Sequence, residues 1–171
     1  FVHSIVIYKI LESRGLTFSG VAGHSLGEFT AFVAAGVLTF EDAVKLVKVR
    51  SSEMASAGEK QPGSMAAIIG ANDEQMKEIC DQEGIVVEAN MNAPGQIVIS
   101  GEVDAVSAAV ETAKKLGIRR AIPLNVSGAF HSPLMKPARE QLSDAMNQLN
   151  FNSPSVPVYQ NVSAKPETDI E

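Results

Sequence analysis

A glycine-rich pentapeptide in the first part of the chain has the spacing of a turn that carries a nucleophile. Residues 23–27 read Gly-His-Ser-Leu-Gly and fit the pattern G-x-S-x-G. In proteins that use this pattern, the serine stands on a sharp turn between a strand and a helix, with its hydroxyl exposed. The first N–H groups of that helix, beginning with Leu26, point toward the same space and can stabilise an oxyanion. The alternative is a turn in which Ser25 only caps the helix.

A serine hydroxyl needs a general base, and the chain has three histidines. His24 is adjacent to Ser25, but neighbouring side chains on a tight turn diverge. His3 lies in the first predicted helix, where packing or exposure to solvent is the simpler interpretation. His131 precedes a predicted helix N-terminus, which disfavours the imidazolium form and so keeps the ring neutral, as a base requires. We therefore predict that His131 is the base; taken alone, a capping or packing role is the alternative.

One arginine falls on the apolar face of a helix predicted over residues 40–57. That face is formed by Ala43, Leu46, Val47 and Met54. Burying a guanidinium is costly unless a carboxylate or phosphate meets it. Arg50 is therefore a candidate ligand for a substrate carboxylate. The alternatives are an arginine whose aliphatic stem lies on the core while its head reaches water, or one that interacts with the helix C-terminus.

The elements that would position these residues alternate between helix and strand. The expected elements of the first 60 residues are helices over 1–14, 26–37 and 40–57 and a strand over 19–22. A helix beginning at Ser132-Pro133 and a strand over 156–162 are expected near the end of the chain. Residues 92–95, Asn-Ala-Pro-Gly, are typical of a turn. The alternative is that Asn92 lines a cleft and binds substrate, and Asn161 is a second candidate of this kind.

Between residues 61 and 125 the pattern changes to short elements in the order strand, helix, strand, strand, helix, strand. This order is typical of a ferredoxin-like subdomain. We predict an α/β fold with a hydrolase-like parallel-sheet core, formed by residues 1–60 and 126–171, and an inserted ferredoxin-like small subdomain at 61–125.

Composition excludes several classes of protein. The 171 residues carry 14 basic and 20 acidic side chains, a net charge of −6, which argues against a general nucleic-acid binder. The single cysteine, Cys80, rules out an internal disulfide framework and a multi-cysteine zinc site, and no metal site is expected. The longest apolar run, residues 31–38, is far shorter than the roughly 18–20 residues of a membrane span. With no signal peptide evident, we expect a cytoplasmic location.

Taken in order, the landmarks resemble a known family. The segment Gly23-His24-Ser25-Leu26-Gly27-Glu28-Phe29, then Arg50, then Gly128-Ala129-Phe130-His131 closely resemble the malonyl-CoA:acyl carrier protein transacylases. That family includes the discrete bacterial fatty-acid enzyme and the acyltransferase domains of fatty-acid and polyketide synthases. The inserted subdomain and residues 90–96 also look like the family. The resemblance covers essentially the whole chain.

The resemblance implies a function and a role for each landmark. Ser25 would be the acylated nucleophile, His131 its general base, and Arg50 the partner of the free malonyl carboxylate. The Leu26 N–H would be one oxyanion donor. The implied reaction moves a malonyl group from coenzyme A to the phosphopantetheine thiol of acyl carrier protein. Coenzyme A thioester is then a substrate, no cofactor stays bound, and the partners are malonyl-CoA and acyl carrier protein, with no nucleic acid or membrane.

The resemblance also implies parts outside these residues. The family has a glutamine upstream of the position of Phe1 that supplies a second oxyanion contact. It also has a backbone carbonyl downstream of the position of Glu171 that holds the histidine. We therefore expect the chain to be the central portion of the enzyme and the isolated portion to turn over poorly.

Two alternatives to a transacylase remain open. A serine esterase or thioesterase shares the turn but usually places an acidic residue between the serine and the histidine in chain order. Asp73, Asp81 and Asp104 are available there, on the predicted subdomain. A non-catalytic fragment is the second alternative.

Overall fold

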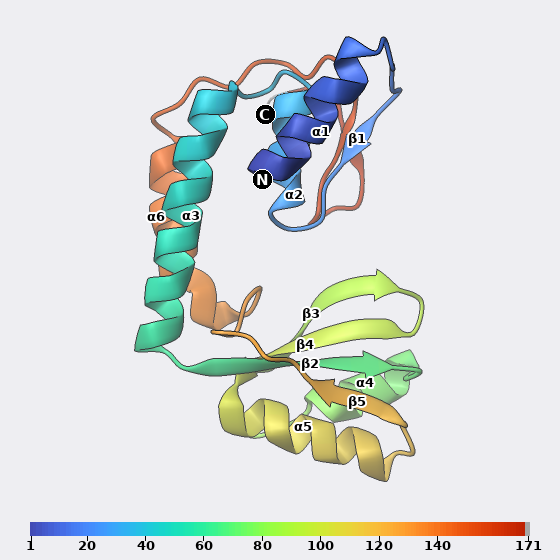
Figure 1. Cartoon of the computed structure of the whole chain (residues 1–171). Coiled ribbons are helices and arrows are strands. Elements are labelled where there is room, and N and C mark those ends of the chain that lie inside the picture. Colours follow the sequence, from blue (N-terminus) through green and yellow to red (C-terminus); the bar gives the residue numbers. More distant parts are fainter. Residues whose placement is uncertain (170–171) are drawn as a thin grey trace. The chain divides into compact units, whose positions relative to one another are not determined.

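The computed structural model describes residues 1–169, which separate into two compact units (Figure 1). The first unit comprises Phe1–Val49 and the described residues from Leu142 onward, and the second comprises Arg50–Gln141. Both units contain helices and strands, so the predicted α/β class is confirmed. The predicted domain boundaries, at 60/61 and 125/126, both fall inside the second unit, and that division stays a prediction.

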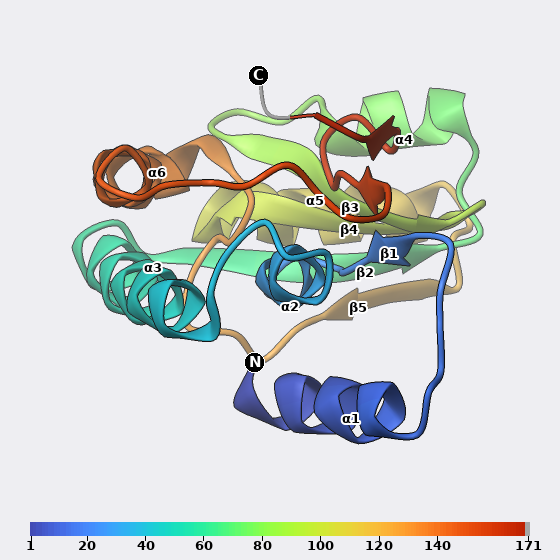
Figure 2. The same ribbon diagram turned by 90° about the horizontal axis from the view of Figure 1, so that it is seen from above.

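The first unit is built around a small mixed sheet. It contains the helices α1 (Val2–Ser13) and α2 (Gly27–Ala34) and the strands β1 (Val21–Ala22), β6 (Val158–Tyr159) and β7 (Pro166–Glu167). The strand order is β1-β6-β7; β1 pairs with β6 in parallel, and β6 pairs with β7 antiparallel. Figure 2 shows β1 in blue beside α2, with the two C-terminal strands in red. Only one pair of this sheet is parallel, so a purely parallel sheet is not what the described residues form.

Both strands of the parallel pair are shorter than predicted, and a proline explains part of the difference. In the register, Val21 faces Val158 and Ala22 faces Tyr159. Pro157, which precedes β6, has no N–H to donate to a neighbouring strand. Its carbonyl does accept a hydrogen bond from the Val21 N–H at 2.9 Å. Pro157 thus contributes an acceptor but no donor to the pair, and the strand β6 begins at the next residue, Val158.

Two helices extend across the division between the units, α3 (Phe40–Lys60) and α6 (Lys136–Met146). The start of α3 at Phe40 agrees with the helix predicted over 40–57, and Thr39 caps it: the Thr39 hydroxyl oxygen accepts from the Asp42 N–H at 3.1 Å and the hydroxyl donates to the Asp42 carboxylate at 2.9 Å. The core of the first unit lies among α2, the first part of α3 and β6. Its buried members are Phe29, Ala31, Ala35, Val37, Leu38, Ala43, Leu46 and Val158.

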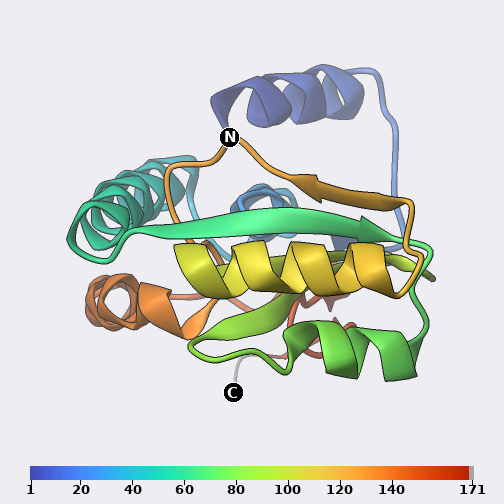
Figure 3. The same cartoon turned by 90° about the horizontal axis from the view of Figure 1, so that it is seen from below.

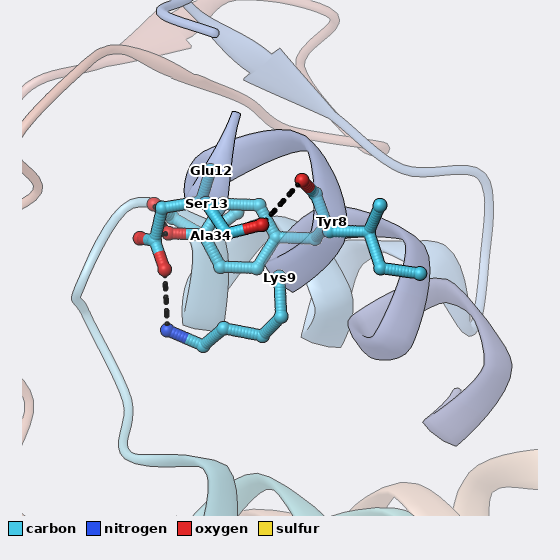
Figure 4. Close-up of polar contacts among 6 residues, drawn as sticks. Tyr8, Lys9, Glu12, Ser13 and Ala34 are labelled. Carbon is cyan, nitrogen blue, oxygen red and sulfur yellow. Dashed lines mark hydrogen bonds and ion pairs between the residues drawn. The ribbon is translucent and has the colours of Figure 1, made fainter. Parts of the chain in front are cut away.

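Helix α1 packs on α2 through one buried residue, Ile5, and one polar contact. The Tyr8 hydroxyl donates to the Glu12 carboxylate at 2.5 Å and lies 3.5 Å from the carbonyl oxygen of Ala34 at the end of α2. Lys9 pairs with the same carboxylate at 2.8 Å (Figure 4). Both partners of that ion pair are exposed, so it contributes little to stability.

The second unit holds a four-stranded antiparallel sheet. Its elements are β2 (Gly63–Ile69), α4 (Asp73–Cys80), β3 (Val86–Ala93), β4 (Gln96–Glu102), α5 (Val103–Lys115) and β5 (Arg120–Pro123). The strand order is β3-β4-β2-β5, and each neighbouring pair is antiparallel. Helices α4 and α5 cover one face of this sheet (Figure 3), and the buried apolar cluster lies between them and the strands. The predicted succession of strands and helices is present.

One turn is displaced from its predicted place. Strand β3 continues through Asn92 to Ala93, so Asn92 is a strand residue, contrary to the predicted turn. The pairing of β3 with β4 shifts register between Met91 and Ala93, which leaves Asn92 as an exposed, bulged residue. The chain reverses at Pro94 and Gly95, where Gly95 has φ +71°. Pairing with β4 outweighs the local turn preference of asparagine because it satisfies more backbone groups.

Candidate active site

Ser25 stands where strand β1 gives way to helix α2. β1 ends at Ala22, α2 begins at Gly27, and Ser25 is half-buried between them with φ +53°. A positive φ in a residue other than glycine costs on the order of 1–3 kcal/mol and persists where the surrounding structure imposes it. The structure therefore places Ser25 on the sharp strand–helix turn that the pentapeptide predicted.

The two glycines of the turn differ in what the fold demands of them. A Cβ added at Gly23 would overlap the carbonyl group of Gly27 and would lie 2.5 Å from the Glu28 nitrogen. All of these atoms belong to the backbone and cannot swing away. A Cβ added at Gly27 would meet nothing within 4 Å. Close approach of strand and helix thus requires glycine only at position 23.

Alanine at these two positions is expected to give opposite results. Gly23→Ala should lower the free energy of unfolding by about 3 kcal/mol or more, because overpacking against fixed backbone is not relieved by side-chain movement. Gly27→Ala should change it by between zero and a gain of about 1 kcal/mol, because alanine restricts the unfolded chain. Denaturant unfolding of the two full-length variants checks this pair, and equal destabilisation would contradict it.

Two of the three N–H groups at the start of α2 donate a hydrogen bond within the described residues, and one does not. The Gly27 N–H donates to the His24 carbonyl at 2.9 Å, and the Glu28 N–H donates to the Ser25 carbonyl at 3.1 Å. Within residues 1–169, no group accepts a hydrogen bond from the Leu26 N–H. Because Leu26 is the N-cap of α2, its N–H lies at the positive end of the helix dipole. This geometry suits the oxyanion role predicted for Leu26.

A residue from the far end of the chain holds the turn. Asn161 lies in the loop between β6 and β7, and its side-chain Oδ1 accepts from the Ser25 N–H at 2.9 Å. Its Nδ2 donates to the Gly23 carbonyl at 2.8 Å, and its backbone N–H donates to the Glu28 carboxylate at 2.9 Å. From the sequence, Asn161 was predicted to bind substrate, and Glu28 was given no role of its own. The one available signal was the position of Glu28, three residues after Ser25.

His131 also occupies an unusual backbone conformation. It is exposed, has φ +62°, and directly precedes Ser132, which is buried. The Ser132 hydroxyl donates to the Ala129 carbonyl at 2.7 Å and accepts from the Leu134 N–H at 3.3 Å. Ser132 therefore caps the following helical turn, which begins at the predicted position; that turn, Pro133–Met135, is a 3-10 helix that leads into α6.

The segment before His131 packs closely on the second half of α3. A Cβ added at Gly58 would lie 2.6 Å from the Ser127 carbonyl oxygen. Phe130 packs against a buried cluster that includes Ala57 of α3, and Met54 of α3 packs against the same cluster. The position of His131 within the second unit is thus determined by tertiary packing, not by the turn alone.

Arg50 is half-buried on α3, one turn before Met54. Burial lowers the pKa of its guanidinium below the ordinary value, because desolvation penalises the charged form. A group held at this cost suits a carboxylate ligand. Half-burial also fits the alternative in which the aliphatic stem of Arg50 lies on the core and its head reaches water, so the substrate role of Arg50 stays a prediction.

Neither a metal-binding cluster nor a reactive thiol is found within residues 1–169. No set of three or more His, Cys, Asp or Glu side chains there is arranged to hold a metal ion. Asp73, Asp81 and Asp104, the acids a hydrolase would need, are all exposed on the second unit. Cys80 is half-buried, and burial, with a contribution from Glu88, raises its thiol pKa to about 11, so it is protonated and unreactive at neutral pH. None of the helices described is long and apolar enough to cross a membrane.

A comparison with known protein families decides the classification. The family described as the acyl transferase domain matches residues 1–171. The chain belongs to this family. A malonyl CoA-acyl carrier protein transacylase of Bacillus subtilis (strain 168) is 47% identical over 170 residues, which is 97% of this chain and 54% of the relative. One from Staphylococcus aureus (strain MRSA252) is 44% identical over 99% of this chain and 56% of the relative.

Solved structures give the same result for this acyl transferase domain. An acyl carrier protein S-malonyltransferase from Vibrio cholerae has a TM-score of 0.90 and 43% identity, over 97% of this chain and 56% of that one. A malonyl-transacylase solved in complex with a type II polyketide acyl-carrier protein has a TM-score of 0.91 and 40% identity, over 97% and 55%. The chain thus spans about half the length of the relatives it matches.

The site residues of the acyl transferase domain divide between its two units. Ser25, Leu26 and Asn161 belong to the first unit. Arg50, Asn92 and His131 belong to the second. The pairing of Ser25 with His131, and the placing of Arg50 and Asn92 against a substrate, therefore stay predictions.

Proposed function

We propose that the protein transfers a malonyl group from coenzyme A to the phosphopantetheine thiol of acyl carrier protein through an acyl-enzyme on Ser25. The observation that carries the proposal is the strained backbone of Ser25 between β1 and α2, with Gly23 packed against the start of the helix. Nucleophilic serines of this pattern occupy such turns. The names of the relatives, malonyl CoA-acyl carrier protein transacylases, supply the acyl group and the partner.

The proposed reaction has two balanced steps. His131 takes the Ser25 proton, the serine oxygen bonds to the malonyl carbonyl carbon, and the carbon–sulfur bond to coenzyme A breaks. The proton on His131 passes to the departing thiolate. In the second step the phosphopantetheine thiol gives its proton to His131 and attacks the acyl-serine. The bond between the serine oxygen and the malonyl carbonyl carbon then breaks, the serine oxygen recovers the proton from His131, and the malonyl group leaves as a thioester of the carrier.

Two groups would stabilise the bound malonyl group. The Leu26 N–H would donate to the oxyanion that forms in each step, because it lies at the N-terminus of α2 with no other acceptor among the described residues. Arg50 would hold the free carboxylate through a bidentate pair, which its half-buried position strengthens. Asn92 is a further proposed substrate contact.

We also propose the finer fold assignment. The order β3-β4-β2-β5, with two helices on one face, supports a ferredoxin-like subdomain in the second unit. The parallel pair of β1 and β6 supports a hydrolase-like core around Ser25. No bound cofactor takes part in the proposed reaction, since coenzyme A thioester is a substrate, and the proposed location is the cytoplasm.

The test is intact mass spectrometry of the full-length protein mixed with malonyl-CoA, followed by addition of acyl carrier protein that bears phosphopantetheine. We expect one malonyl group on Ser25 that then moves to the carrier thiol. Release of malonate to water without transfer would favour an esterase or thioesterase. Absence of any adduct would favour a non-catalytic protein.

A further inference from the structure

We propose that Asn161 is a positioning residue that holds the Ser25 turn in its reactive conformation. The inference rests on the proposed function, because it takes Ser25 as the nucleophile. It assigns the Asn161 amide to the turn, in place of the substrate contact expected from the sequence. Three hydrogen bonds carry it, to Ser25, Gly23 and Glu28.

The amide of Asn161 matches the turn at both ends. The Ser25 N–H can only donate, and it faces Oδ1 at 2.9 Å; the Gly23 carbonyl can only accept, and it faces Nδ2 at 2.8 Å. Rotating the amide by half a turn would place donor against donor and acceptor against acceptor. An aspartate carboxylate would keep the first contact and repel the Gly23 carbonyl. Asparagine is the residue type of this size that satisfies both groups.

Strand pairing and two hydrogen bonds from backbone N–H groups place Asn161 beside the Ser25 turn, independently of the contacts that its side chain makes. β1 and β6 run parallel, with Ala22 opposite Tyr159, so the chain leaves both strands at the same edge of the sheet. The Gln160 N–H donates to the Lys165 carbonyl at 3.1 Å, which closes the loop. The Asn161 N–H donates to the Glu28 carboxylate at 2.9 Å, a charge-assisted bond that ties the loop to α2.

The three hydrogen bonds of Asn161 to Ser25, Gly23 and Glu28 form a clamp on the turn. This clamp has two consequences for the proposed reaction. It offsets the cost of the positive φ at Ser25, because two backbone groups of the turn, the Gly23 carbonyl and the Ser25 N–H, gain a partner. It also occupies the Ser25 N–H, which leaves the Leu26 N–H as the oxyanion donor from this turn. Without the clamp, Ser25 would relax toward negative φ, and its hydroxyl and the Leu26 N–H would lose their alignment.

The test compares variants of the full-length protein by single-turnover acylation with malonyl-CoA. Asn161→Ala should lower the acylation rate constant at saturating substrate by about 10- to 100-fold, the scale expected for a misplaced reacting group. The KM should stay within about threefold, because no substrate contact is removed. Glu28→Ala should have a smaller effect in the same direction, whereas Glu28→Gln keeps the acceptor oxygen and should restore most of the rate.

Asn152→Ala is the matched control. Asn152 is an exposed asparagine of the same unit that donates to the Gly36 carbonyl at 3.4 Å and makes no bond to the turn. It should acylate like the unsubstituted protein. A raised KM with an unchanged rate constant in Asn161→Ala would assign the residue to substrate binding and overturn the proposal. So would a loss of rate no larger than the unfolded fraction measured by circular dichroism.

Reaction with an aryl sulfonyl fluoride tests the reactivity of Ser25 without malonyl transfer, so failure of this inference can be distinguished from failure of the proposed function. The reagent bonds its sulfur to a nucleophilic serine oxygen and releases hydrogen fluoride, without malonyl or coenzyme A. If Ser25 is sulfonylated but takes no malonyl group, the proposed function fails, and slower sulfonylation of Asn161→Ala still supports the clamp. If Ser25 reacts with neither reagent, or if Asn161→Ala is sulfonylated at the unsubstituted rate, the clamp is overturned.

Discussion

Replacing Ser25 with alanine is expected to abolish the malonyl adduct in the full-length protein and to leave the fold intact. The hydroxyl oxygen is the atom proposed to bond to the malonyl carbonyl carbon, and alanine lacks it. Removal of a serine nucleophile lowers turnover by roughly 10⁶-fold. Alanine keeps the Cβ and the N–H, so the hydrogen bond from position 25 to Asn161 remains. Intact mass after mixing with malonyl-CoA measures the adduct, and thermal unfolding measures whether the fold is intact.

Two further variants sharpen this result. Ser4→Ala removes a hydroxyl from the exposed surface of α1 and should form the adduct normally. His131→Ala should still form the adduct, but more slowly by a factor on the order of 10²–10⁴, the range for a lost general base. Full turnover by Ser25→Ala would remove Ser25 from the reaction.

Replacing Arg50 with alanine is expected to change which acyl group is transferred. A malonyl group carries a carboxylate that an acetyl group lacks, and that carboxylate must still lose its hydration when the arginine is gone. Truncating one partner of a desolvated charge pair typically costs 2–5 kcal/mol. The ratio of the specificity constants for malonyl-CoA and acetyl-CoA should therefore fall by on the order of 10²- to 10³-fold. Acetyl transfer itself should be spared or improved.

Two variants of α3 serve as comparisons. Arg50→Lys keeps the charge but loses the planar fork, so it should be impaired for malonyl-CoA to a lesser degree. Lys48→Ala removes an exposed charge from the same helix and should leave the ratio unchanged. An unchanged ratio in Arg50→Ala would remove Arg50 from the substrate site and would favour an esterase.

Much of the secondary structure was predictable because its causes are local. The cap of α3 depends on Thr39 and Asp42, three residues apart. The end of α1 depends on Gly15, whose φ of +74° glycine adopts without cost. Predictions were weaker wherever distant residues compete with local preference. Asn92 favours a turn, but pairing with β4 extends β3 through Asn92, where the strand forms a bulge.

In the candidate site, too, the features with local causes were predictable and those that depend on distant residues were not. Spacing alone predicted the turn at residues 23–27, because the sharp bend and the close approach at Gly23 depend on neighbours within five positions. The periodicity of α3 likewise predicted that Arg50 lies on a face shared with Leu46, and its half-burial agrees. No local pattern could indicate that Glu28 and Asn161 hold the turn.

The sequence by itself determined the α/β class, the serine turn and the place of Arg50 on its helix, since each depends on residues a few positions apart. Only the tertiary structure decided the positive φ at Ser25 and the clamp by Asn161. Asn161 is 133, 136 and 138 residues away in the chain from its partners Glu28, Ser25 and Gly23. They meet because β1 and β6 pair in parallel, and that pairing depends on the packing of the whole first unit.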